Sequence, residues 1–163
     1  MKHLLFIILI IFISCKSETP TEFSQEALED KVFTLNNEEI TLEDVLAKYK
    51  GKTILMDVWA SWCGDCIKGL PKVSELQREY KDITYLFISI DKSTEDWKNG
   101  IEKYKIKGEH YLLPSGRDGD FDLFMNLDWI PRYVVIDSEG KIALFRAVEA
   151  DDERILKALN VAL

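Results

Sequence analysis

The chain has 163 residues, of which 47% are hydrophobic and 31% are charged, as expected for one folded domain rather than a disordered or fibrous chain. Its net charge of −8, with no block of five or more Lys and Arg, argues against nucleic acid as a partner, because neutralising phosphates needs clustered cations. Three cysteines are too few for a scaffold stapled by disulfides.

The N-terminus has the pattern of a secretory signal. A short basic start is followed by an uninterrupted apolar run from Leu4 to Ile13, far shorter than the roughly 20 residues of a spanning helix. Ser14 and Cys15 come directly after it, which resembles a bacterial lipoprotein signal. We therefore expect residues 1–15 to be a lipoprotein-type signal peptide that ends at a lipidated Cys15, although a plain signal peptide or an uncleaved anchor would share the apolar run. Residues 16–30 are polar and are expected to form a flexible tether.

The remaining residues, 31–163, alternate strand-like and helix-like patterns. We expect a pair of short strands at 32–35 and 40–42, longer strands at 53–60, 83–90, 132–137 and 141–146, and helices at 43–50, 63–80, 93–105, 120–127 and 151–163. The strand at 53–60 is almost continuously apolar, which predicts a central strand buried on both faces. The stretch 107–120 is rich in turn residues. This order predicts an α/β fold with a central mixed sheet and helices on both faces.

Two cysteines, Cys63 and Cys66, mark the expected boundary between the central strand and its helix. Thiols at this spacing can close a small disulfide ring, and a helix N-terminus can stabilise one of them as a thiolate. The pattern predicts a dithiol/disulfide redox centre. A structural disulfide or a pair of zinc ligands would use the same residues. Tetrahedral zinc needs two more ligands, and the sequence has only His3, in the signal, and His110, in the turn-rich stretch. We therefore expect neither a metal nor a cofactor.

Two carboxylates stand close to the dithiol in sequence. Asp57 interrupts the apolar strand, where burial should raise its pKa. Gly64 and Asp65 separate the cysteines and are interpreted as redox-tuning residues. A negative charge at Asp65 opposes ionisation of Cys63 and would make the reduced protein a better reductant, unless the carboxylate is solvated and screened.

The whole pattern resembles the thioredoxin fold, a three-layer sandwich. The resemblance covers residues 32–160 and is carried by Trp-Cys-x-x-Cys after a buried strand, the helix proline Pro71, and Ile130-Pro131 before a β-hairpin. The N-terminal hairpin, an insertion before Ile130-Pro131, and the lipoprotein-like signal are similar to the membrane-anchored, extracytoplasmic TlpA/ResA-like thiol-disulfide oxidoreductases. There are departures: proline is common where Asp65 stands, Gly69 occupies a position where cytochrome-maturation members often carry glutamate, and Trp129 replaces the usual glycine.

The resemblance implies roles for individual residues. Cys63 is expected to attack the substrate, Cys66 to resolve the mixed disulfide, and Asp57 to accept the proton of Cys66. Pro131 is the candidate for a cis peptide bond that exposes the backbone of Ile130 to an extended substrate segment. Among the tryptophans, Trp62 is the best candidate for this substrate groove because it precedes Cys63.

The resemblance also implies a place and partners. It indicates a monomer on the periplasmic side of a bacterial membrane, held by a lipid anchor, that reduces protein disulfides with electrons from a membrane thiol transporter. Two other functions compete with this one. A membrane-tethered metal-handling or binding module would use the dithiol as soft ligands. A peroxide-reducing enzyme would need threonine three residues before the reactive cysteine, where this chain has Ala60.

Overall fold

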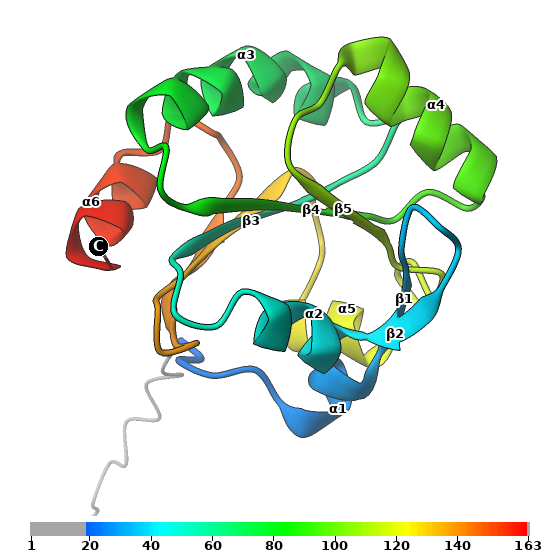
Figure 1. Ribbon diagram of the computed structural model, residues 1–163, viewed down its shortest axis with the longest axis horizontal. Coiled ribbons are helices and arrows are strands. Elements are labelled where there is room, and N and C mark those ends of the chain that lie inside the picture. Colours follow the sequence, from blue (N-terminus) through cyan, green and yellow to red (C-terminus); the bar gives the residue numbers. More distant parts are fainter. Residues whose placement is uncertain (1–18, 163) are drawn as a thin grey trace, which may run out of the picture.

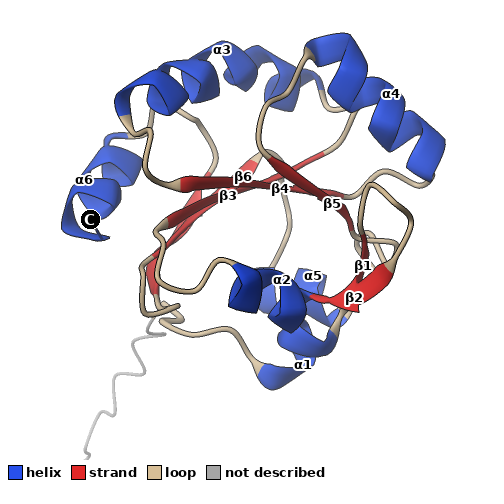
Figure 2. Cartoon of the chain, viewed as in Figure 1, coloured by secondary structure: helices blue, strands red, loops and turns tan. Residues whose placement is uncertain are grey.

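The computed structural model describes residues 19–162, in which a seven-stranded mixed sheet separates two layers of helices (Figures 1 and 2). The strands lie in the order β2-β1-β5-β4-β3-β6-β7. The strands are β1 (Lys31–Phe33), β2 (Glu39–Thr41), β3 (Ile54–Trp59), β4 (Thr84–Ser89), β5 (Glu109–Leu112), β6 (Arg132–Ile136) and β7 (Ile142–Ala147). The helices are α1 (Gln25–Glu29), α2 (Leu42–Lys48), α3 (Gly64–Glu79), α4 (Thr94–Tyr104), α5 (Asp120–Met125) and α6 (Glu153–Ala162).

The core of the sheet follows from the apolar run in β3. All six residues of β3 are buried, and the strand pairs in parallel with β4 and antiparallel with β6. The connections β3–α3–β4 and β4–α4–β5 both step in the same direction across the sheet. Because such crossovers are right-handed, α3 and α4 lie on the same face. Figure 1 shows α1, α2 and α5 on the other face. The predicted thioredoxin-like fold with a central, fully buried β3 is therefore confirmed.

Two elements were not predicted. Residues 25–29, expected to belong to the tether, form α1, whose N-cap Ser24 accepts a hydrogen bond from the Ala27 N–H and whose Ala27 is buried. One and a half turns are too short to give a helical periodicity. The strand β5 lies in the stretch that was expected to consist of turns. It was missed because its four residues are mostly buried and show no alternation of polar and apolar residues between Gly108 and Pro114.

The expected signal peptide and Cys15 lie outside the described residues. Within residues 19–162, the structure contains no helix that is both long and apolar enough to cross a membrane.

Candidate active site

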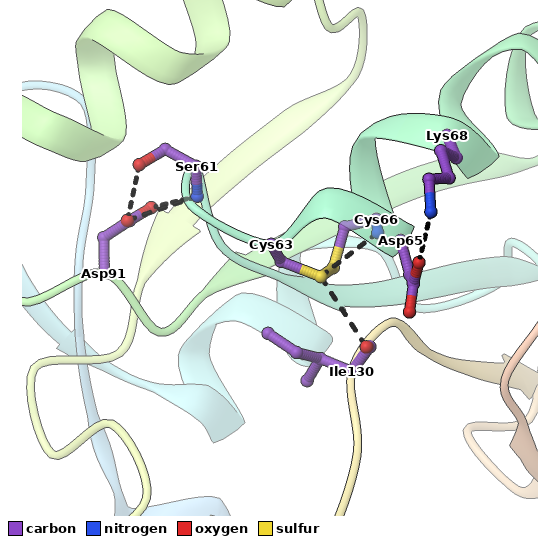
Figure 3. Close-up of a disulfide and its surroundings, with 7 residues drawn as sticks. All are labelled: Ser61, Cys63, Asp65, Cys66, Lys68, Asp91 and Ile130. Atoms are coloured by element: carbon purple, nitrogen blue, oxygen red, sulfur yellow. Dashed lines mark hydrogen bonds and ion pairs between the residues drawn. A yellow bond between two sulfur atoms is a disulfide. The ribbon is translucent and has the colours of Figure 1, made fainter.

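Cys63 and Cys66 form a disulfide at the N-terminus of α3, with their Cα atoms 5.3 Å apart (Figure 3). Cys63 is the N-cap residue of α3, and its Sγ accepts a hydrogen bond of 3.1 Å from the Cys66 N–H. Since this N–H points along the helix dipole, it would also stabilise a thiolate on reduced Cys63. Cys63 is 6% exposed and Cys66 only 1%, so Cys63 is the more accessible of the two cysteines.

The turn before Cys63 is held by residues from β4 and α4. The buried carboxylate of Asp91, two residues after the end of β4, accepts hydrogen bonds from the Ser61 N–H (3.0 Å) and the Ser61 hydroxyl (2.7 Å) (Figure 3). It also accepts a hydrogen bond of 2.7 Å from the Ser89 hydroxyl. Gly100 of α4 packs directly against Ser61: a Cβ added at Gly100 would lie 2.6 Å from the Ser61 Cβ. Asp91 and Gly100 therefore fix the loop that carries Cys63, although no local motif marked either residue.

A second loop approaches the disulfide from the opposite side. The Ile130-Pro131 peptide bond is cis, and the Ile130 carbonyl oxygen lies 3.6 Å from the Cys63 Sγ. The fully buried guanidinium of Arg132 anchors this loop: it donates to the carbonyl oxygen of Met125 (2.7 Å) and to the Asp128 carboxylate (2.7 Å). Arg132 thus positions Ile130, a role that sequence reasoning missed because the hydrogen bonds depend on how the preceding loop turns its carbonyl groups, which no sequence pattern shows.

The surface around Cys63 is an aromatic cleft of about 230 Å³. Trp62 and Trp129 flank the cleft and are 62% and 55% exposed, whereas Trp59 belongs to the core. Arg117, from the loop before α5, also borders it. The structure therefore brings the predicted groove residues Trp62 and Ile130 together beside Cys63, and adds Trp129 and Arg117 to the same surface.

Asp57 lies behind this site, on the face of β3 that α3 covers. Its side chain is almost fully buried, and Oδ1 has no hydrogen-bond partner among residues 19–162. Burial raises the pKa of Asp57 from 3.8 to about 8. Its cross-strand neighbours are Phe87 on β4 and Tyr133 on β6. A carboxyl group with a pKa in this range can exchange a proton near neutral pH.

Asp65 is less isolated than the sequence suggests. Its carboxylate forms an ion pair of 3.0 Å with Lys68, and both side chains are well exposed (Figure 3). Gly64 is the first residue of α3. Because Lys68 and solvent both screen the carboxylate, its effect on the Cys63 sulfur is small. Of the two interpretations of Asp65, this geometry favours the screened charge.

His110 was expected in a loop but lies in β5, where it is buried and stacked on Phe87 with ring centroids 5.2 Å apart. One ring nitrogen, Nε2, lies 3.1 Å from the Ile106 carbonyl oxygen, and burial lowers the pKa of His110. In the part of the chain that the structure describes, no three His, Cys, Asp or Glu side chains are grouped so that they could hold a metal ion.

Comparison with known proteins places this site in a family. Residues 51–142 match a family model described as thioredoxin-like. An uncharacterised protein of Haemophilus influenzae is 34% identical over 144 residues, covering 78% of this chain and 86% of the relative. The thiol-disulfide oxidoreductase ResA of Bacillus thuringiensis is 27% identical, covering 86% of both chains. The solution structure of a candidate thiol-disulfide oxidoreductase from Bacteroides vulgatus superposes with a TM-score of 0.68 at 30% identity, covering 91% of this chain and 92% of that one.

The chain belongs to the thioredoxin-like family. Its similarity to ResA and to the Bacteroides structure confirms the predicted enzyme class, the thiol-disulfide oxidoreductases.

Proposed function

We propose that this protein is an extracytoplasmic reductase that exchanges the Cys63–Cys66 dithiol with disulfides of protein substrates. The observation that carries the proposal is the position of the Cys63 sulfur, which lies at the N-terminus of α3, against the Ile130 carbonyl oxygen and at the floor of the aromatic cleft. In this setting an extended substrate segment can lie along Ile130 while Trp62 and Trp129 cover its side chains.

The reaction proceeds in two exchanges. In the first, the Cys63 thiolate attacks one sulfur of the substrate disulfide, which breaks that bond and forms a mixed disulfide while the other substrate sulfur leaves as a thiolate. In the second, Cys66 attacks the Cys63 sulfur, the mixed disulfide breaks, and the second substrate sulfur leaves. The substrate gains two electrons and, from solvent, two protons, and the Cys63–Cys66 disulfide of the structure is the product.

Asp57 serves the second exchange. Cys66 is buried and must lose its proton before it attacks, and Asp57 is an ionisable group on the part of β3 that α3 covers. Its raised pKa matches the task, because a base works best when its pKa is close to the working pH. In its carboxylate form Asp57 takes the Cys66 proton, directly or through one water molecule.

The proposed location rests on the sequence. The apolar run that ends beside Cys15 supports a mature protein lipidated at Cys15 and held at the periplasmic side of a membrane, with residues after Cys15 joining the anchor to the domain. In this location a membrane thiol transporter would return electrons to the disulfide. Mass spectrometry of membrane-extracted protein tests the anchor. An acylated Cys15 is expected, and an unmodified new N-terminus elsewhere would contradict it.

Trapping tests the proposed exchange. Cys66→Ser should stall at the first step and accumulate mixed disulfides with substrate proteins through Cys63. Cys63→Ser is the matched control, since it removes the exposed sulfur and leaves only the buried one. Adducts on the first variant and none on the second are expected. Equal trapping by both variants, or by neither, would contradict the assigned order of attack.

A further inference from the structure

Two buried polar groups on neighbouring strands have no partner in the structure. The Oδ1 of Asp57 and the hydroxyl of Tyr133 are both buried without a hydrogen bond. Asp57 and Tyr133 lie directly opposite each other in the antiparallel pair of β3 and β6, so both side chains project from the same face of the sheet. Buried polar atoms are almost always paired, with protein or with water. Their position on one face of the sheet, opposite each other, points to a shared role.

Gly69 of α3 leaves room for the Tyr133 hydroxyl. A Cβ added at Gly69 would lie 3.0 Å from that oxygen, closer than most Cβ atoms approach a neighbour. The missing side chain therefore admits the phenol between α3 and the sheet. Tyr133 also borders an open cavity of about 500 Å³ between α3 and the loop that follows β7, although its own surface is fully covered. The Tyr133 hydroxyl thus lies between Asp57 and this open cavity.

We propose that the Tyr133 hydroxyl is the proton-transfer group that links Asp57 to solvent in this cavity. This assignment rests on the proposed function, in which Asp57 accepts the Cys66 proton, and adds Tyr133 to that proton transfer. When Cys66 attacks, its proton moves to the Asp57 carboxylate. Because the two groups are not hydrogen-bonded to each other, one water molecule between them carries the proton from Asp57 to the Tyr133 oxygen. The phenol proton then leaves to water in the cavity, so that one proton crosses and Tyr133 ends as it began.

The electrostatic surroundings suit a neutral relay. Burial raises the pKa of Tyr133, and the charges of Asp57 and Asp151 raise it further, so the phenol stays protonated and can donate to a water molecule. From β4, Asp57 is faced by the apolar ring of Phe87. The charged residues that line the cavity are Asp65, Lys68 and Lys72 on α3 and Glu149 and Asp151 after β7. These residues carry both positive and negative charges, and none of them forms a hydrogen bond with the phenol.

The titration of Asp57 in Tyr133→Phe tests the proposal. This substitution removes only the hydroxyl and keeps the ring. Without the phenol, the water between the two groups loses the partner that orients its hydrogen bond toward the carboxylate, which should raise the Asp57 midpoint by about one pH unit, a tenfold change in acidity. NMR of the labelled Asp57 carboxyl in the purified protein measures the midpoint without any activity assay. Resolution of a trapped mixed disulfide should slow several-fold at neutral pH, while the first attack by Cys63 keeps its rate.

Matched variants separate a relay from a structural role. Tyr85→Phe is the control, because it removes another largely buried hydroxyl, one that donates to the Tyr80 carbonyl oxygen. It should leave the Asp57 midpoint unchanged. Gly69→Ala should shift the midpoint by displacing the phenol. Adding Tyr133→Phe to Asp57→Asn should slow resolution no further.

An Asp57 midpoint that is the same in Tyr133→Phe and in the parent would overturn the relay while leaving the oxidoreductase intact. A parent protein that exchanges no disulfides would instead overturn the proposed function, whatever the titration shows.

Discussion

Asp57→Asn should make the folded protein more stable, and the gain should depend on pH. In the unfolded chain the Asp57 carboxyl loses its proton near 3.8, whereas in the folded protein burial holds its pKa at about 8. Between these values the folded state binds more protons than the unfolded state, so the free energy of unfolding of the parent falls as the pH rises. Asparagine has no ionisable carboxyl group, so the free energy of unfolding of the variant does not fall with pH in this way.

The expected size follows from the shift. Each unit of pKa difference corresponds to about 1.4 kcal/mol, so the difference between variant and parent should grow from near zero at about pH 4 to roughly 4 kcal/mol at neutral pH and level off near 6 kcal/mol above pH 8. Burying the asparagine amide without a partner subtracts an amount that is the same at every pH. The change with pH therefore reports Asp57 itself.

Urea unfolding of the oxidised protein from about pH 4 to pH 9 measures this difference, since the cysteines do not titrate while the disulfide is intact. Asp65→Asn is the matched control, because Asp65 is well exposed and its substitution should give no comparable trend. A difference between Asp57→Asn and the parent that stays flat with pH would refute the burial argument.

Three substitutions test how the site is supported. Gly100→Ala should destabilise the domain by about 1–3 kcal/mol in thermal unfolding, because the new Cβ meets Ser61; an unchanged midpoint would show that the contact is loose. Arg132→Met should cost about 3 kcal/mol in urea unfolding by leaving loop carbonyls unpaired, and no loss would contradict the anchoring role. Trp62→Ala should raise KM for a protein disulfide while sparing reaction with a small dithiol. An unchanged KM would place Trp62 outside the substrate path.

Most of the fold was predictable because its strongest signals are local. The apolar run of β3 marks the centre of the sheet, and the helix N-cap at Ser93 is visible in sequence: its hydroxyl accepts a hydrogen bond of 3.1 Å from the Asp96 N–H. Short elements gave no comparable signal. α1 has too few residues to show a helical period, and β5 is too short to show alternation.

The site residues also differ in how far the sequence could predict them. Cys63, Cys66 and Asp57 stand in one stretch of chain, so their chemistry can be inferred from spacing and apolar context. Asp91 supports the site through Ser61, which is 30 residues away in sequence and is brought near by the fold. Arg132 acts on its own preceding loop, through carbonyl groups whose orientation no sequence pattern shows. In sequence, Asp91 is only a polar residue after a strand, and Arg132 is only a cation at the start of a strand.

The reduction potential of the Cys63–Cys66 disulfide tests the central claim most directly. Equilibration with a dithiothreitol or glutathione couple, followed by thiol alkylation, counts the two thiols at each potential. A reductase predicts one reversible two-electron transition near or below about −270 mV, the value of thioredoxin. A transition as oxidising as about −150 mV, or a disulfide that does not equilibrate at all, would contradict it.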